Sequence, residues 1–242
     1  MGQRETVLDI SGLHSSYGMI KAIKDINIHV DKGELVSLLG ANGAGKSTLL
    51  KSIIGMVHIE SGSVKYQGEE LVGRKSHEII PMGISIVPEG RKIFADATVM
   101  ENLAIGSYTR AADKALDQKI LDQVFEFFPR LAERKGQMGG TLSGGEQQML
   151  AFSSGMMGLP KLLIMDEPSL GLAPNIVDNI FSIAKEVAQE SGLTIILVEQ
   201  DVRKALRIAN RGYVIENGQI TVSGTAEELL NNDEVKKAYL GF

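Results

Sequence analysis

The most informative segment of the chain is Gly40-Ala41-Asn42-Gly43-Ala44-Gly45-Lys46-Ser47. It matches the pattern G-x-x-x-x-G-K-[ST] in full. A short apolar run at residues 34–39 precedes it and predicts a buried strand, and a helix is predicted from residue 46 to about residue 54. A chance glycine-rich turn would not need this strand–loop–helix context. The segment therefore predicts a loop that binds phosphate.

The residue types of this loop suit a nucleotide triphosphate. Glycines let the backbone turn its N–H groups inward as an anion nest, and the N-terminus of the following helix adds partial positive charge. Lys46 would reach the β- and γ-phosphates, and the Ser47 hydroxyl would bind Mg²⁺. The predicted nucleotide contacts here are Gly40, Ala41, Asn42, Gly43, Ala44, Gly45, Lys46, Ser47 and Thr48.

An acidic pair follows a second buried strand, predicted at residues 162–165. Asp166 and Glu167 stand at the carboxyl end of this strand, which is the edge where parallel sheets bind ligands. Asp166 is suited to hold Mg²⁺, and Glu167 is suited to polarise an attacking water. A solvated turn before Pro168 is the structural alternative. The phosphate loop upstream favours the catalytic interpretation.

A third motif, LSGGEQQ, occupies residues 142–148. Ser143 and Glu146 form an S-x-x-E capping box, which predicts a helix start. The capping box does not explain Gly144 and Gly145, because each glycine costs a helix about 1 kcal/mol. Close approach of another phosphate to this helix N-terminus would explain them.

Composition narrows the class of protein. The chain has 242 residues, 43% of them hydrophobic, so it can bury a substantial core. It has 25 Lys and Arg against 30 Asp and Glu, a formal net charge of −5, which argues against a nucleic-acid partner. With no cysteine it has no disulfide, and no apolar run reaches 18 residues. The first six residues lack the apolar core of a signal peptide, and we attribute the match of Gly2 and Thr6 to a myristoylation pattern to chance.

Strands are predicted at residues 7–10, 22–30, 34–39, 62–67 and 84–87, and again at 162–165, 194–198, 214–216 and 219–222. Residues 98–157 are predicted to be helical, with a capping box at Thr98 and Glu101 and a helix over 117–128. Further helices are predicted at 174–190, 202–209 and after Thr225. Buried strands that alternate with helices predict an α/β fold with a parallel sheet and helices on both faces.

The three motifs, in this order and spacing, resemble those of the ATP-binding cassette (ABC) ATPases over essentially the whole chain. The resemblance implies one domain over 1–242, with an N-terminal antiparallel β subdomain and a RecA-like P-loop NTPase core in 1–97 and 158–242. A helical subdomain would be inserted at 98–157. It also implies a head-to-tail dimer with two ATP molecules, each held between the phosphate loop of one subunit and Ser143, Gly144, Gly145 and Glu146 of the other. Tyr17 would stack on adenine.

Four positions depart from the general ABC pattern. Glu89 replaces a Gln and could bind Mg²⁺, and Gln200 replaces the switch His that contacts the γ-phosphate. Ala173 replaces an Asp, and Ser154 replaces an Arg after the signature. VPEGR at 87–91, SLGLAP at 169–174 and VEQ at 198–200 resemble the ATPases of branched-chain amino-acid importers, and among these the smaller of the two ATPase subunits.

The resemblance implies the partners: permease subunits, gripped through the loop that begins at Glu89, a second ATPase subunit in a homo- or heterodimer, and indirectly a substrate-binding protein. The chain would sit on the cytoplasmic face of the inner or plasma membrane. The alternatives are an importer of urea or short amides, a lipopolysaccharide exporter, an ABC protein of DNA or ribosomes, and a regulatory cassette that binds ATP without cleaving it. The single phosphate loop, the single signature and the lack of a heptad tract disfavour the DNA and ribosome class.

Overall fold

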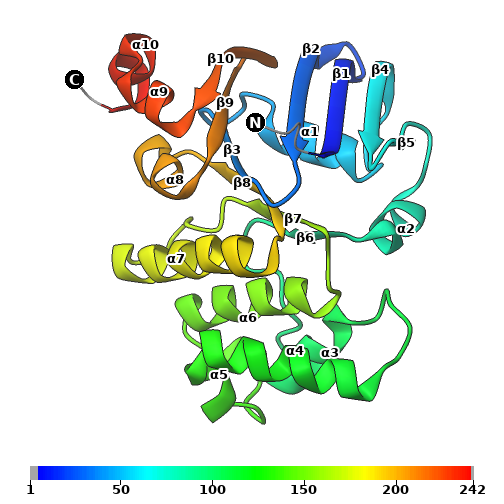
Figure 1. Cartoon of the computed structure of the whole chain (residues 1–242), viewed down its shortest axis with the longest axis vertical. Coiled ribbons are helices and arrows are strands. Elements are labelled where there is room, and N and C mark those ends of the chain that lie inside the picture. Colours follow the sequence, from blue (N-terminus) through cyan, green and yellow to red (C-terminus); the bar gives the residue numbers. More distant parts are fainter. Residues whose placement is uncertain (1–4, 241–242) are drawn as a thin grey trace.

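The structure is a computed structural model, and it describes residues 5–240. The myristoylation pattern at Gly2 and most of the segment tested for a signal peptide lie outside the described residues. Figure 1 shows two sheets beside each other at one end of the molecule and a group of helices at the other. We describe the sheets first because they position the functional residues.

The smaller sheet is antiparallel, in the order β2-β1-β4-β5. Its strands are β1 (Thr6–Tyr17), β2 (Ile20–Asp31), β4 (Ile59–Tyr66) and β5 (Glu69–Glu70). The predicted strands at 7–10, 22–30 and 62–67 are confirmed, although β1 and β4 extend further and β5 was not predicted. Alternate residues such as Ile26, Ile28 and Val30 are buried, while Asn27 and His29 between them are exposed, which is the period of two read from the sequence.

The larger sheet has six strands in the order β10-β9-β3-β8-β7-β6. Its strands are β3 (Leu35–Leu39), β6 (Ile84–Val87), β7 (Leu162–Asp166), β8 (Thr194–Glu199), β9 (Arg211–Glu216) and β10 (Gln219–Thr225). Five of them run parallel. The expected parallel sheet has one antiparallel edge, because the turn Asn217-Gly218 joins β9 and β10 as a hairpin.

Register places two sequence motifs at one edge of this sheet. Leu39, the last residue of β3, pairs with Glu199 of β8, and Asp166 at the end of β7 pairs with Val198. The phosphate loop follows β3, and the acidic pair ends β7. Because the strands are parallel, their carboxyl ends bring both motifs to the same side of the molecule.

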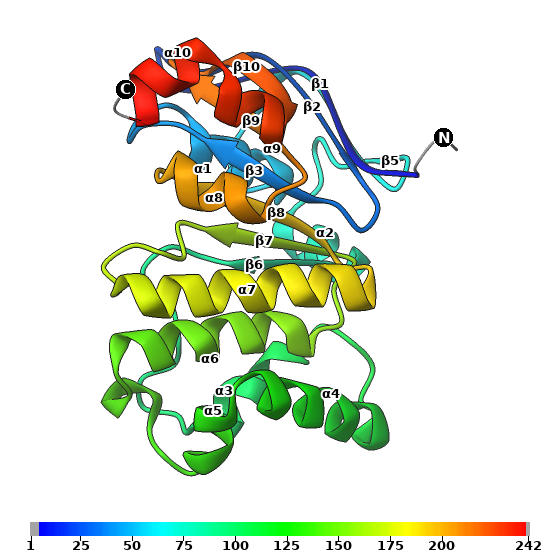
Figure 2. The same ribbon diagram turned by 60° about the vertical axis from the view of Figure 1, so that its left-hand side comes forward.

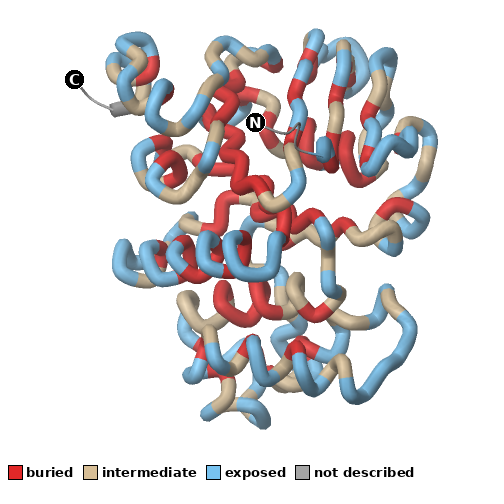
Figure 3. Tube along the Cα trace, in the orientation of Figure 1, coloured by how far each residue is buried: buried red, intermediate tan, exposed pale blue. Residues whose placement is uncertain are grey.

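The core sheet is covered on both faces. In β3, Val36 and Leu38 pack with α1 (Lys46–Ile53) and the antiparallel sheet, whereas Leu35 and Leu39 face the opposite cluster. The second cluster is completed by α6 (Gly144–Met157), α7 (Pro174–Ser191) and α8 (Val202–Ile208). Figure 3 shows the buried residues gathered along the core strands and the helix faces that meet them. The prediction of helices on both faces is confirmed.

Residues 98–157 form helices, as predicted. They comprise α3 (Val99–Gly106), α4 (Lys114–Phe127), α5 (Pro129–Glu133), the 3-10 turn Gly139–Thr141 and α6. The capping boxes at Thr98 and Ser143 are present. Helix α4 begins three residues before the predicted start, because Asp113 accepts hydrogen bonds from the N–H groups of Ala115 and Leu116. Figure 2 shows these helices below α7, at the far end from the antiparallel sheet.

The remaining helices are short: α2 (Ser76–Ile79), the 3-10 helix Ile80–Met82, α9 (Ala226–Asn231), α10 (Asp233–Val235) and the π-helical turn Lys236–Leu240. The predicted capping box at Thr225 and Glu228 opens α9. In the described part of the chain, no helix has the length and apolar character needed to cross a membrane.

A buried ion pair joins the two sheets. Glu34, 2% exposed, accepts hydrogen bonds from Arg211 at 2.6 Å and 3.1 Å, and Arg211 also donates to the carbonyl of His29 in β2. We expect Arg211→Met to lower the free energy of unfolding by about 3 kcal/mol, because it leaves the Glu34 carboxylate buried and unpaired. Urea unfolding measures this, with Lys32→Ala as the control. The pair of Lys32 with Glu5 is exposed, so its loss should cost less than about 1 kcal/mol, and equal losses in the two variants would contradict the assignment.

Candidate functional site

A cleft of about 390 Å³ lies at the carboxyl edge of the core sheet, over the loop between β3 and α1. It brings together residues that are far apart in sequence. Those predicted as site residues that line it are Tyr17, Asn42, Gly43, Gly45, Lys46, Ser47, Thr48, Glu89 and Glu167. Gly40 and Ala44 are buried beneath the loop, Ala41 is exposed beside it, and Asp166 and Gln200 do not line the cleft.

Two loop positions require glycine for packing as well as for anion binding. Gly45 has φ +114°, and a Cβ there would lie 2.9 Å from the carbonyl oxygen of Ala22. A Cβ on Gly40 would overlap the carbonyl oxygen of Ile215 in β9. The loop therefore lies directly against β2 and β9, and these neighbours fix its path.

Lys46 is buried at 4% exposure and holds the loop together from within. Its Nζ donates to the carbonyl oxygens of Gly40 at 2.8 Å and Ala41 at 3.0 Å. The same Nζ lies 3.2 Å from Oε1 of Glu167, which is also buried. The predicted phosphate-binding cation and the predicted catalytic carboxylate are thus direct partners.

Glu167 is positioned by backbone and side-chain contacts on both sides. Its φ of +45° lies in the left-handed region, which non-glycine residues seldom adopt. Its N–H donates to the carbonyl of Val198 at 2.9 Å, and its Oε2 accepts a hydrogen bond from Nε2 of Gln200. Gln200, in the place of the family's His, therefore contacts the carboxylate and does not line the cleft itself.

Asp166 has the properties of a cation ligand. Its Oδ1 is buried and has no hydrogen-bond partner among the described residues. Burial, followed by the charges of Glu167 and Glu89, raises the pKa of Asp166 from 3.8 to about 6, against the opposing effect of Lys46 and Lys51. The described residues contain no group of three or more His, Cys, Asp or Glu side chains arranged to hold a metal. The unpartnered Oδ1 of Asp166 and the hydroxyl of Ser47 in the cleft are oxygen donors of the kind that Mg²⁺ prefers.

Because Oδ1 of Asp166 is buried without a hydrogen-bond partner, we expect this residue to make the stability of the fold depend on pH. Because its pKa in the fold lies above that of the unfolded chain, stability falls as pH rises from about 4 through 6. We expect Asp166→Asn, without nucleotide or Mg²⁺, to unfold at a higher temperature than the unchanged chain at about pH 8 and at an equal temperature at about pH 4. Thermal unfolding in a chelator tests this, with exposed Asp178→Asn as the control. A difference that does not depend on pH would contradict the assignment.

The signature residues lie away from this cleft. Ser143 is exposed at the start of α6, and Glu146 accepts hydrogen bonds from its N–H at 2.9 Å and its hydroxyl at 2.8 Å. An ion pair at 3.1 Å with Arg134 holds Glu146 in turn. No residue from Ser143 to Glu146 lines the cleft that contains Lys46. Within one chain, the structure therefore does not bring the signature to the phosphate loop.

The two signature glycines have close neighbours that the sequence did not reveal. A Cβ on Gly144 would overlap the guanidinium of Arg91, and a Cβ on Gly145 would lie 2.9 Å from Cγ2 of Ile176 in α7. The Arg91 guanidinium ends a flexible side chain that can move, so only Gly145 has a firm packing reason, and the close approach of a phosphate stays a prediction. Arg91, with φ +54°, was not predicted as a functional residue, and it links the segment after Glu89 to the signature helix.

Sequence reasoning missed other residues of the site. Glu199 is 2% exposed, has a pKa raised by burial, and accepts hydrogen bonds from both the N–H and the hydroxyl of Ser169. The turn Asn217-Gly218 lines the cleft and supports the phosphate loop, because Gly218 N–H donates to the carbonyl of Ala44 at 2.8 Å. An acidic residue at the end of a buried strand was the available signal for Glu199. The sequence of the turn predicted a hairpin but gave no sign that the turn lines the cleft.

The structure also shows the contacts of Ser154 and Ala173, the two other positions that depart from the family pattern. Ser154, in the place of an Arg, donates to the carbonyl of Asn102 at 3.0 Å, and a Cβ on Gly106 would overlap the carbonyl oxygen of Ser154. Close packing of α3 on α6 thus favours glycine at residue 106, and α6 continues to Met157. Ala173 is the exposed N-cap residue of α7 and makes no side-chain cap hydrogen bond.

Comparison with known proteins agrees with this geometry. Residues 23–170 match the family model described as "ABC transporter". The chain is 50% identical to BraG of Pseudomonas aeruginosa, a high-affinity branched-chain amino acid transport ATP-binding protein, over 97% of this chain and all of that one. It is 35% identical to LivF of Archaeoglobus fulgidus, a probable branched-chain amino acid transport ATP-binding protein, over 95% and 96% of the two chains.

Among solved structures, the ADP conformation of MJ1267, an ATP-binding cassette of an ABC transporter, is similar with a TM-score of 0.86. The two are 26% identical, and the match covers 98% of this chain and 99% of that one. The fold expected from the resemblance is therefore confirmed. The chain belongs to the ABC transporter family, as one of its ATP-binding cassette ATPases.

Proposed function

We propose that the chain binds MgATP between two cassettes and couples its hydrolysis to uptake of branched-chain amino acids through separate permease subunits. The ATPase assignment rests on the separation of two half-sites, the phosphate-loop cleft and the signature at Ser143. The phosphate-loop cleft lacks signature residues, and Ser143 is exposed elsewhere on the same chain. A second cassette, identical or related, would complete each site. The names of the relatives support the amino-acid cargo.

In this proposal the triphosphate takes the place of Glu167 as the partner of Lys46. Lys46 would release Oε1 of Glu167, 3.2 Å away, and bind the β- and γ-phosphates, with the loop N–H groups and Ser47 around them. The released carboxylate would accept a proton from the attacking water, while Gln200 holds its other oxygen in place. Mg²⁺, when bound by Ser47, Asp166 and Glu89, would neutralise phosphate charge. Tyr17, which lines the cleft, would stack on the adenine.

The permease contact is proposed at an exposed apolar surface formed by the loop that begins at Glu89 and by the helical subdomain at 98–157. Tyr108 is 89% exposed, and Phe94, Ile105 and Met138 are each exposed by more than 40%. Ile105 and Tyr108 line an open groove with Asp96 and Glu101. Exposed apolar groups that share one surface, as Ile105 and Tyr108 do, are typical of a protein contact. This contact would place the chain on the cytoplasmic face of the membrane, next to a permease that works with a substrate-binding protein.

Reconstitution tests the proposal. We expect proteoliposomes with the chain, its second cassette, the permease subunits and the binding protein to take up leucine only with MgATP. Tyr108→Asp should release the chain from the permease, whereas Met56→Asp, at a residue 62% exposed on another surface, should not. Uptake of urea or a short amide instead would correct the cargo. ATP binding without any hydrolysis in the full assembly would identify a regulatory cassette.

A further inference from the structure

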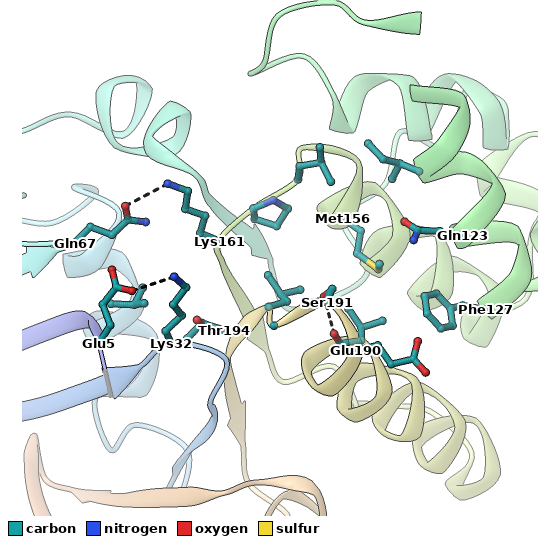
Figure 4. Close-up of a pocket in the computed structure, with 17 residues that line it drawn as sticks. Glu5, Lys32, Gln67, Gln123, Phe127, Met156, Lys161, Glu190, Ser191 and Thr194 are labelled. Atoms are coloured by element: carbon teal, nitrogen blue, oxygen red, sulfur yellow. Dashed lines mark hydrogen bonds and ion pairs between the residues drawn. The ribbon is translucent and has the colours of Figure 1, made fainter. Parts of the chain in front are cut away.

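Strands β7 and β8 lie side by side in the core sheet and run in the same direction. Their amino ends border a hollow of about 570 Å³, where Figure 4 shows Lys161 and Thr194. Their carboxyl ends lead to two residues proposed for hydrolysis, Glu167 after β7 and Gln200 after β8. The last residue of β8 is Glu199, an acidic side chain to which the proposed function gives no role.

Glu199 is buried without a cation beside it. Its side chain is 2% exposed, and within residues 5–240 it forms no ion pair. Burial of a carboxylate is costly unless hydrogen bonds satisfy its oxygens. The N–H of Ser169 donates to Oε1 at 3.0 Å, and its hydroxyl donates to Oε2 at 2.8 Å. The N–H of Gln200 donates to Oε2 at 3.2 Å, so the carboxylate joins two segments that are distant in sequence.

One of these segments is the turn that carries the Glu167 carboxylate. A backbone hydrogen bond of 3.2 Å across residues 167–170 closes this turn. Glu167 has φ +45°, and a residue in this conformation persists only where its surroundings hold it. The carbonyl of Val198 accepts a hydrogen bond from the N–H of Glu167 at 2.9 Å. The next residue of β8, Glu199, holds Ser169 two positions further along the turn.

The other segment is the end of β8 itself, where Gln200 begins the next connection. The backbone N–H of Gln200 donates to the Glu199 carboxylate, and its side-chain Nε2 donates to Oε2 of Glu167. Glu199, the turn, Glu167 and Gln200 thus form a closed ring of contacts. Hydrogen bonds to a charged acceptor are stronger than those between neutral groups. The Glu199 carboxylate therefore restrains the backbone on both sides of the place where the two side chains meet.

From this ring we infer that Glu199 is a positioning residue for ATP hydrolysis. It would hold the Glu167 carboxylate and the Gln200 amide in the relative placement in which the carboxylate faces the attacking water. Glu199 does not line the cleft, so it would touch neither the nucleotide nor the water. The inference rests on the proposed function, because it takes Glu167 as the general base. It adds a residue that determines how this base is oriented.

Loss of this contact should affect the rate of hydrolysis and not the binding of the nucleotide. The contacts of Lys46 in the phosphate loop, among the described residues, do not include Glu199. Glu199→Gln keeps the shape of the side chain but replaces one oxygen with an N–H donor. Whichever way the amide is oriented, this donor faces the backbone N–H of Ser169 or that of Gln200. The substitution therefore disrupts the ring in either orientation.

Steady-state ATP hydrolysis by the assembled transporter and ATP binding by the purified chain test the inference. We expect Glu199→Gln to lower kcat at least about tenfold, while KM and the dissociation constant for ATP change by less than about twofold. Ser169→Ala removes only the hydroxyl and should lower kcat less, whereas Ser169→Thr keeps a hydroxyl and should retain normal turnover. Because both residues act through one contact, the double variant of Glu199→Gln with Ser169→Ala should lose no more than Glu199→Gln alone.

Glu34→Gln is the matched control for loss of a buried carboxylate. Glu34 is also 2% exposed and accepts hydrogen bonds, but it stands before β3 at the opposite edge of the sheet from the cleft. This variant should unfold at a lower temperature and keep its kcat when assayed well below that temperature. Thermal unfolding of each variant sets the assay temperature.

A kcat for Glu199→Gln within about twofold of normal would overturn the inference. A loss of kcat that Glu34→Gln shares would also overturn it, because the loss would then follow stability and not the contact with Ser169. The failure of the proposed function is distinct from these results. An unchanged assembly that does not hydrolyse ATP would contradict the proposed function and this role together, whereas normal turnover with Glu199→Gln contradicts the role of Glu199 alone.

Discussion

Glu167→Gln is expected to lower ATP hydrolysis by the assembled transporter about 10³-fold while ATP binding persists. The amide cannot accept the proton of the attacking water, although it has the same shape. It also removes the ion pair that holds Lys46 at 3.2 Å, so Lys46 reaches the triphosphate with one competing contact fewer. We therefore expect the dissociation constant for ATP to fall as the turnover rate collapses.

Steady-state phosphate release and fluorescent-nucleotide binding measure the two effects. Glu186→Gln, on the exposed face of α7, is the control for loss of one carboxylate. A Glu167→Gln variant with more than about a tenth of the normal rate would contradict the role of Glu167 as the general base.

Lys46→Ala is expected to weaken MgATP binding by at least about a hundredfold, because among the described residues only the Lys46 ammonium donates to both loop carbonyls, where the phosphates would bind. The structure adds a second effect that the sequence did not predict. Without Lys46, the Glu167 carboxylate stays buried with no cation, so the variant should also be less stable.

A double variant separates these two effects. Adding Glu167→Gln to Lys46→Ala removes the unpaired charge and should restore much of the lost stability, while MgATP binding stays weak. Calorimetric titration and thermal unfolding follow both properties in each variant, with Lys185→Ala as an exposed control. Unchanged MgATP affinity in a folded Lys46→Ala chain would contradict the phosphate-loop assignment.

The fold was predictable where a pattern within one segment is enough to identify its strand or helix. Alternation around Ile26 to Val30 identified a half-buried strand, and the capping boxes at Thr98 and Ser143 identified helix starts, because both signals depend on nearest neighbours. The carboxyl ends of β3 and β7 could be placed together because parallel strands share one edge.

Contacts between distant segments could not be predicted in the same way. Nothing in the sequence around Gly144 indicates that Arg91 lies beside it, or that Gly106 lies against the backbone of Ser154 where α3 packs on α6. The partnership of Lys46 with Glu167 joins residues over a hundred positions apart, and only the assembled sheet creates it. Residue type predicted the chemical roles of Lys46 and Glu167, but it did not predict that the two side chains form an ion pair with each other.

We infer that the γ-phosphate of ATP joins two cassettes through the phosphate loop of one and the exposed Ser143 of the other. Light scattering during gel filtration of the Glu167→Gln chain, alone and mixed with the second cassette of its transporter, measures this most directly. We expect about twice the 26.1 kDa of one chain with MgATP, the mass of one chain with MgADP, and loss of the larger species on Ser143→Arg. A mass of one chain in saturating MgATP under both conditions would contradict it.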